Sequence, residues 1–122
     1  MEYVSALVFP FIILLVENFL PYPHIIEEVF KFFLAKYANT TKVAIILGLL
    51  FSISEAIFYL LNPEYSIVGG IGKSATRFLL VTPMHITTIL VMQYFARKTN
   101  LWPIGLILAI LIHYLFNSVG SN

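Results

Sequence analysis

The strongest constraint on the fold is a series of apolar stretches that are each long enough to cross a lipid bilayer. A membrane-spanning helix needs roughly 20 mainly apolar residues, because each residue adds only about 1.5 Å of length. Four or five stretches qualify, of which the second is short and carries four charges: Tyr3–Leu20, Ile25–Ala38, Lys42–Leu61, Lys73–Lys98 and Leu101–Val119. The chain is 60% apolar and 11% charged, whereas a soluble domain is nearer a quarter charged. A globule of 122 residues cannot bury so much apolar surface. We therefore predict an integral membrane protein that sits in a lipid bilayer.

Proline and glycine divide these stretches into helices. Pro21 and Pro23 close the first stretch and Pro63 closes the third, because proline disfavours helix at and before its own position. We predict an all-α fold, a polytopic transmembrane bundle of four to five helices in a single domain over residues 1–122. The predicted helices cover residues 3–20, 25–38, 42–61, 73–98 and 101–119, with a glycine-containing loop before the fourth and a kink at Pro83 inside it.

The ends of the helices predict an orientation. Glu2 stands where a cleaved signal peptide would have basic residues, so the first stretch is expected to be a retained helix. If all five helices span, four basic residues near the helix ends share one side with the N-terminus: Lys36, Lys42, Arg97 and Lys98. The positive-inside rule then places the N-terminus in the cytoplasm.

Several partner and cofactor classes are disfavoured by composition. The net charge is +1, which gives no indication of a nucleic-acid partner. There is no cysteine, which excludes disulfides, thiolate metal sites and a cysteine nucleophile within this sequence.

The informative residues are ionisable side chains inside the apolar helices, where each is costly and therefore a functional candidate. They are Glu17, Glu27, Glu28, Lys31, Glu55, His85 and His113. Glu17 lies near a helix end and is assigned no role, and His24 is expected at the interface. The others come from four helices and lie within about three turns of the same predicted membrane face, the non-cytoplasmic one. This convergence is what a buried polar site would need.

Spacing within each helix suggests pairs. Lys31 is placed to pair with Glu27 at i,i+4 or with Glu28 at i,i+3, and His113 shares a helix face with Asn117. Simpler interpretations stay open for each: a surface ion pair for Lys31, and an interhelical clasp for His113 and Asn117. Glu55 is harder to explain in this way, because no cation lies within one turn of it.

Taken in order, these residues read Glu27-Glu28-x-x-Lys31, Phe51-x-x-x-Glu55, His85 and His113-x-x-x-Asn117. This series resembles the superfamily of CAAX prenyl and bacteriocin-processing proteases, PrsW-type proteases and the anterior-pharynx-defective subunit of gamma-secretase. The resemblance covers the chain from about Ile25 to Asn117 and leaves the first helix outside.

Two departures from the CAAX protease pattern favour the PrsW branch. That group usually has Arg four residues after the second Glu of the pair, where this chain has Phe32, and His four residues after the motif Phe, where it has Glu55.

The resemblance implies an intramembrane endopeptidase that hydrolyses a membrane-anchored protein. Glu27 and Glu55 would hold and deprotonate a water, with Glu28 beside them and Lys31 in support. Two close carboxylates in low dielectric do not both ionise easily, so one can act as base and the other as acid. His113 and Asn117 would donate to the oxyanion, and His85 would orient the water or join the donors.

A zinc version of this site is also possible, with His85, His113 and a carboxylate such as Glu55 as ligands. The helix-borne His-Glu-x-x-His zinc motif is absent from the sequence, so we favour the version without a cofactor.

Two other classes of function fit the same residues. In a non-catalytic scaffold subunit, the buried polar groups would only hold helices together. In a small transporter, Glu17 in the first helix would carry the coupled proton, and the later polar residues would matter less.

Overall fold

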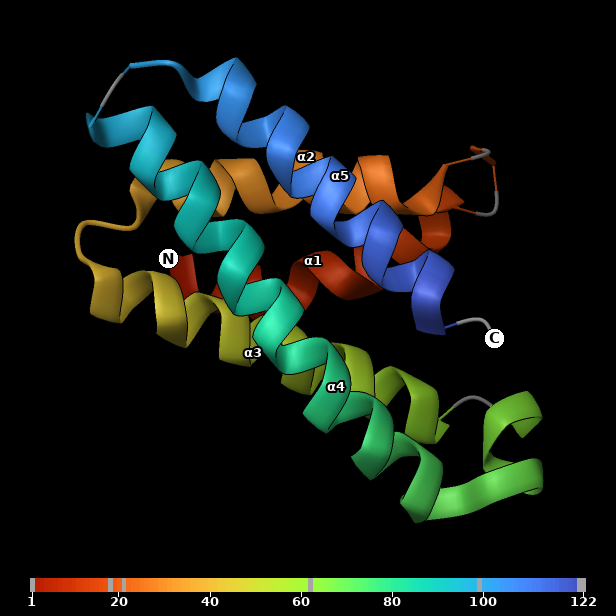
Figure 1. Ribbon diagram of the computed structural model, residues 1–122. Helices are drawn as coiled ribbons and strands as arrows, with labels where there is room; N and C mark the ends of the chain where they lie inside the picture. The colour runs from red at the N-terminus through yellow and green to blue at the C-terminus, as the bar shows by residue number, and fades with distance from the viewer. Residues whose placement is uncertain (1, 18, 21, 62, 99, 121–122) are drawn as a thin grey trace.

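The computed structural model describes residues 2–17, 19–20, 22–61, 63–98 and 100–120, which form five α-helices and no strand within these ranges (Figure 1). The helices are α1 (Glu2–Glu17), α2 (Pro23–Tyr37), α3 (Thr41–Leu61), α4 (Pro63–Lys98) and α5 (Trp102–Gly120). The predicted all-α bundle is confirmed.

Most helix ends follow from local chemistry. Pro23 starts α2 at a position where its missing N–H costs no hydrogen bond. The Thr40 hydroxyl caps α3 by accepting the Val43 N–H at 3.2 Å. Asn100 adopts the left-handed conformation, with φ at 56°, in the turn between α4 and α5, a conformation that asparagine tolerates better than most residues.

Two predicted boundaries are wrong. Helix α1 ends at Glu17 rather than at residue 20, because Pro21 and Pro23 disfavour helix in the residues that precede them. Helix α4 begins at Pro63 rather than at residue 73, so the glycine segment is helical instead of a loop. Proline is well suited to the first turn of a helix, and this start outweighs the modest cost of each helical glycine.

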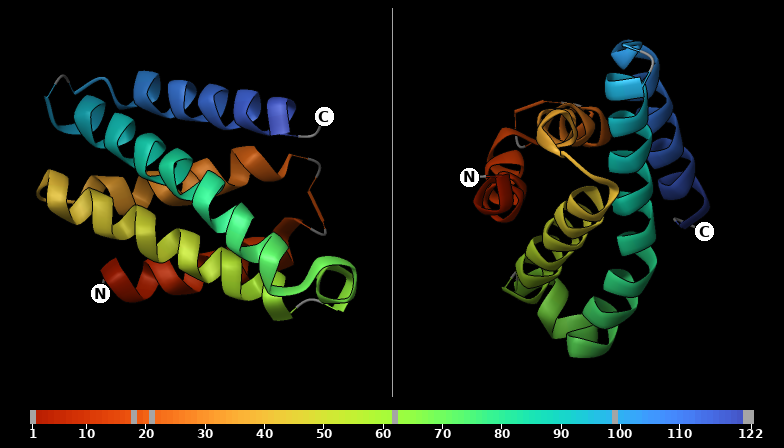
Figure 2. Two further views of the ribbon diagram at one scale, coloured as in Figure 1. Left: turned by 60° about the horizontal axis from the view of Figure 1, so that its bottom comes forward. Right: turned by 90° about the vertical axis from the view of Figure 1, so that its left-hand side faces the viewer.

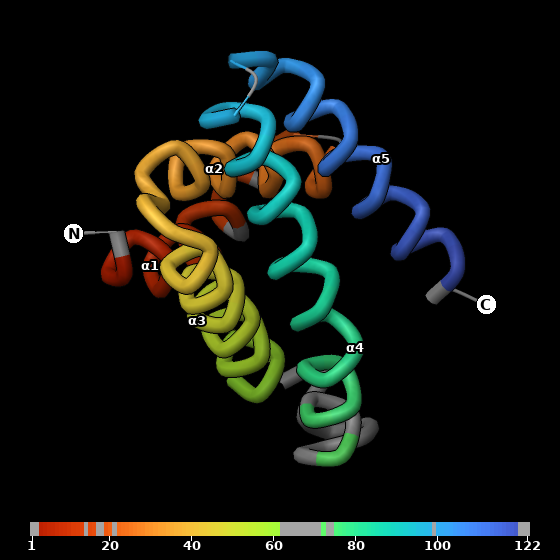
Figure 3. Tube along the Cα trace, turned by 60° about the vertical axis from the view of Figure 1, so that its left-hand side comes forward, coloured from red at the N-terminus to blue at the C-terminus, as the bar shows by residue number. Residues whose placement is uncertain are grey.

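Helix α2 is the centre of the bundle. It contacts each of the other four helices, while α1 and α5 lie on opposite sides of the bundle (Figure 2). The most extensive packing joins α3 to α4 and α4 to α5, and the tube in Figure 3 shows α4 running between its two neighbours. Helix α1 packs on α2 and α3, where the Ser54 hydroxyl donates to the Leu7 carbonyl at 2.6 Å.

Within the described ranges, three helical segments are long and apolar enough to cross a membrane: Thr41–Leu61, Ala75–Lys98 and Trp102–Val119. Large apolar side chains cover the outside of the bundle, among them Leu15, Leu61, Leu79, Ile107 and Val119. A water-soluble monomer rarely exposes apolar surface on this scale, so the fold is consistent with an integral membrane protein.

Three of the four charged residues of α2 point into the bundle, namely Glu27, Glu28 and Lys31, whereas Lys36 is exposed. Glu28 and Lys31 are fully buried, whereas Val29 and Phe33 on the opposite face are exposed. Because this face of α2 packs against the neighbouring helices, Glu28 and Lys31 are shielded from the surroundings of the bundle. This inverted arrangement places the polar site in the interior.

Candidate functional site

Lys31 anchors the polar cluster on α2. Its ammonium lies 2.6 Å from Glu27 Oε1 and 2.7 Å from Glu28 Oε1, and its side chain has no exposed surface. The ammonium also lies over the Phe51 ring of α3, at 4.9 Å from the centroid. Both pairings that the sequence spacing suggested are therefore present, and Lys31 partly neutralises two carboxylates at once.

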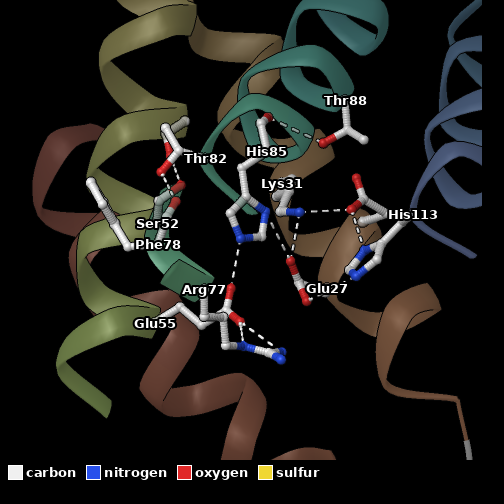
Figure 4. Close-up of polar contacts among 12 residues, drawn as sticks. Glu27, Lys31, Ser52, Glu55, Arg77, Phe78, Thr82, His85, Thr88 and His113 are labelled. Atoms are coloured by element: carbon white, nitrogen blue, oxygen red, sulfur yellow. Dashed lines mark hydrogen bonds and ion pairs between the residues drawn. The ribbon is translucent and has the colours of Figure 1, made fainter. Parts of the chain in front are cut away.

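His85 of α4 lies between two carboxylates from different helices (Figure 4). Its Nε2 is 2.6 Å from Glu55 Oε2, and its Nδ1 is 3.3 Å from Glu27 Oε1. The Phe51 ring packs against the imidazole at 5.0 Å between centroids. His85 therefore joins α2 to α3 through its two ring nitrogens.

His113 of α5 makes a similar connection. Its Nδ1 lies 2.8 Å from Glu28 Oε1, and its Nε2 lies 3.8 Å from Glu27 Oε2. A carboxylate only accepts hydrogen bonds, so Nδ1 carries the proton that is donated to Glu28. In the neutral ring, Nε2 is then an acceptor.

Arg77 is a member of the cluster that the sequence prediction did not include. Its Nε and Nη2 each lie 3.3 Å from Glu55 Oε1, and its guanidinium carbon lies 4.2 Å from the centroid of the Tyr59 ring. Its position near the start of the apolar, membrane-length segment Ala75–Lys98 could have indicated a role, because charged residues in such segments are costly.

A cavity of about 180 Å³ lies beside these groups. All five helices contribute to its wall, which includes Pro10, Ile13, Glu27, Glu55, Arg77, His113 and Asn117. The predicted residues Glu27, Glu55, His113 and Asn117 thus meet at one space. Glu28, Lys31 and His85 lie behind this wall and contact its residues.

Three residues of the cavity wall, one from α2 and two from α1, were not expected from the sequence. His24, expected at the interface, lines the cavity and packs near His113 at 6.3 Å between ring centroids. Helix α1, which lies outside the resemblance, forms part of the wall through Pro10 and Ile13. The side chain of Glu17 lies outside the described part of the structure.

Some buried polar atoms of the cluster have no hydrogen-bond partner. They are Glu28 Oε2, Glu27 Oε1 and His85 Nδ1. Glu27 Oε1 is close to Lys31, but as an ion pair rather than in hydrogen-bonding geometry. Unpaired buried polar atoms are uncommon and costly, and they are typical of sites that take up water, ions or protons.

Among the residues that the structure describes, two groups of side chains have the composition of a metal site. Glu27, Glu55 and His85 can offer one ligand atom each within 4.8 Å of one another, and so can Glu27, Glu28 and His113. Each group contains only one histidine. The zinc site expected from the sequence instead has His85 and His113 bound to the same metal ion. These acidic and histidine residues could hold a metal ion.

The chain was also compared with known proteins. No protein-family model matches the chain, and neither does any curated protein or any solved structure.

Proposed function

We propose that this protein is an intramembrane endopeptidase that hydrolyses a membrane-anchored protein with a water activated by Glu27. The observation that carries the proposal is the convergence of Glu27, Glu55, His113 and Asn117 on one internal cavity. The motif series that resembles PrsW-type and CAAX proteases supports the same function, and so does the position of Glu55, His85 and His113 within membrane-length helices.

The charge of the cluster favours a proton over a metal ion. Glu27, Glu28 and Glu55 contribute −3, and Lys31 and Arg77 contribute +2, which leaves −1 when both histidines are neutral. One bound proton brings the cluster to zero, whereas a divalent ion would bring it to +1. The ion would also lie close to the Lys31 ammonium, which is already 2.6 Å from Glu27 Oε1. A net charge is expensive in a low-dielectric interior, so we favour a site without a cofactor.

Both ring nitrogens of His85 face carboxylate oxygens, Nε2 toward Glu55 and Nδ1 toward Glu27. A neutral imidazole has one donor and one acceptor, so it can donate to only one of the two carboxylates. Nε2 lies 2.6 Å from Glu55, whereas Nδ1 has no hydrogen-bond partner. This unit can therefore accept one further proton next to the cavity.

The nucleophilic water is assigned to the space between Glu27 Oε2 and His113 Nε2. Both atoms are acceptors, and their separation of 3.8 Å is too long for a hydrogen bond. One water can donate to both of them and present its oxygen to the cavity. Lys31 occupies the other oxygen of Glu27, which leaves Oε2 as the basic atom.

Hydrolysis then proceeds in two steps. The water loses a proton to Glu27 as its oxygen bonds to the scissile carbonyl carbon, and the Asn117 amide donates to the oxyanion. The C–N bond then breaks as the leaving nitrogen takes a proton from Glu27, which yields a carboxylic acid and an amine. In this scheme, Asn117 is the donor to the oxyanion and His113 positions the water, because the resting Nε2 of His113 is an acceptor.

The membrane arrangement follows from the same proposal. With the N-terminus in the cytoplasm, the cavity faces the non-cytoplasmic side. Such a site suits a membrane-anchored substrate that is cleaved just outside the bilayer, and it does not suit a cytoplasmic prenylated one.

The test is cleavage of solubilised membrane proteins by the purified protein in detergent, with new N-termini read by mass spectrometry. Wild type should generate new termini, and Glu27→Gln should abolish them. Asn117→Ala should slow their formation by about 100–1,000-fold. Ser118→Ala is a matched control, because its exposed hydroxyl donates to the Tyr114 carbonyl of its own helix and does not line the cavity.

A non-catalytic scaffold is the second candidate, and one observation favours it. The cluster ties α2 to α3, α4 and α5 through ion pairs and hydrogen bonds, as a purely structural network would. In that case Glu27→Gln would lower stability or assembly, and wild type and variant would produce the same termini.

A further inference from the structure

Arg77 occupies a position that the proposed chemistry does not use. It lies in α4, eight residues before His85, and its side chain keeps 49% of its surface exposed, whereas Lys31 has none. It forms part of the cavity wall together with Glu55 and Tyr59. A cation at the edge of an internal cavity is available to a ligand, unlike a buried one.

The contact with Glu55 does not use the full capacity of the guanidinium. Nε and Nη2 converge on one oxygen, Oε1, at 3.3 Å each, whereas a strong arginine–carboxylate pair uses two parallel bonds of about 2.7–2.9 Å. Glu55 is already held more closely by His85, at 2.6 Å. Within the described part of the chain, no second hydrogen-bond acceptor contacts the remaining donors of Arg77.

Tyr59 keeps the guanidinium in place. The guanidinium carbon lies 4.2 Å from the centroid of the Tyr59 ring, and stacking of this kind fixes the plane of an arginine without consuming its in-plane donors. The Nη1–Nη2 edge therefore remains a planar, pre-oriented pair of donors, which is the geometry that binds a carboxylate in a bidentate manner.

We propose that Arg77 binds a carboxylate of the peptide substrate beside the scissile bond, so that the enzyme prefers a substrate with an acidic side chain or a free C-terminus at that position. This inference rests on the proposed peptidase function and names its substrate class. At about 180 Å³ the cavity has room for one amino-acid side chain, since an engineered cavity of roughly 150 Å³ holds one benzene.

The experiment measures binding without turnover. The full-length protein carries Glu27→Gln, so that no peptide is cleaved, and binding is followed by isothermal titration in detergent. Three acetylated tetrapeptides are compared: Ala-Glu-Ala-Ala amide, Ala-Gln-Ala-Ala amide and Ala-Ala-Ala-Ala with a free C-terminal carboxylate. The first and third distinguish a side-chain carboxylate from a chain terminus, and the second is neutral.

The expected result is that at least one carboxylate peptide binds about tenfold or more tightly than the neutral one. Arg77→Gln should remove this preference. Arg77→Lys should retain only part of it, because an ammonium is a point charge without a planar pair of donors. Arg77→Gln should also leave the melting temperature nearly unchanged, since a half-exposed ion pair adds little stability.

Two outcomes would overturn the proposal. One is equal binding of acidic and neutral peptides, or a preference that survives Arg77→Gln. The other is saturable binding of phosphatidylglycerol micelles that requires Arg77 while no peptide preference exists, which would make it a lipid contact. Because binding is measured in an inactive variant, it is independent of cleavage. Selective binding without any cleavage by wild type would refute the peptidase and keep the carboxylate site.

Discussion

Removal of the buried cation is the sharpest test of how the cluster is held together. Lys31→Met would leave Glu27 and Glu28 without their shared ammonium, which lies within 2.7 Å of both. The charge of the cluster would change from −1 to −2 in a site with no exposure at Lys31. Breaking a buried ion pair in this way typically costs about 3–5 kcal/mol. For a chain of 122 residues this corresponds to a fall in melting temperature on the order of 10–20 °C.

The assay is thermal unfolding in detergent micelles, followed by far-ultraviolet circular dichroism, for wild type, Lys31→Met, Glu28→Gln and the double variant. Glu28→Gln restores the cluster to −1 when it is combined with Lys31→Met. The double variant should therefore be more stable than the sum of the single effects predicts, by about 0.5–3 kcal/mol of interaction energy. Strictly additive effects, or a cost of Lys31→Met below about 1 kcal/mol as for an exposed pair, would refute this reasoning.

Further predictions concern the packing of the helices and the metal content of the site. Gly48→Ala should destabilise the bundle by about 1–3 kcal/mol in the same unfolding assay, because the new Cβ would lie 2.8 Å from the α4 backbone. A Cβ added at Gly72 has no neighbouring atom within 4 Å in the described part of the structure, so Gly72→Ala should leave the stability unchanged or raise it by up to about 1 kcal/mol. An equal loss of stability in Gly48→Ala and Gly72→Ala would contradict the packing argument. Gln93→Leu should lower the free energy of unfolding by about 1–3 kcal/mol. The buried Gln93 amide donates to the Ala38 carbonyl at the end of α2 at 2.7 Å, and the variant loses this hydrogen bond. An unchanged melting temperature would show that the bond does not contribute to stability. Protein purified without chelators should contain no stoichiometric zinc by elemental analysis, and near one zinc per chain would overturn the charge argument.

The sequence predicted the parts of the site that depend on spacing along one helix. The pairs of Lys31 with Glu27 and with Glu28 follow directly from i,i+4 and i,i+3 geometry. The helical class followed from apolar stretches of membrane length. Both depend only on residues close together in the sequence, so they can be predicted from one sequence without knowledge of the helix packing.

Contacts between helices could not be predicted in the same way. The pairing of His113 with Glu28 joins residues 85 positions apart, and nothing in the spacing determines which of two adjacent glutamates it meets. The pairing of Arg77 with Glu55 spans 22 positions and requires α3 and α4 to be neighbours. The contribution of α1 to the cavity wall could not be predicted either. Pro10 and Ile13 are apolar residues of the kind found throughout such helices, and only the packing of α1 brings them to the cavity.

The helix boundaries show where local rules compete. The glycines before residue 73 indicated a loop, yet Pro63 at a favourable first position begins a helix that continues through them. Glycine lowers helix stability by only about 1 kcal/mol per residue, which packing or a good start can outweigh. Glycine clusters are therefore weaker evidence for a loop than proline is for a boundary.

The central claim is that Glu27 activates a water for peptide hydrolysis, and an isotope measurement tests it most directly. Solubilised membrane proteins are incubated with wild type or Glu27→Gln in water enriched in oxygen-18, and the new C-termini are read by mass spectrometry. The account predicts one solvent-derived oxygen in each new C-terminal carboxyl group with wild type and Ser118→Ala, and no new termini with Glu27→Gln. Labelled termini that form equally in Glu27→Gln, or a wild type that forms none, would contradict it.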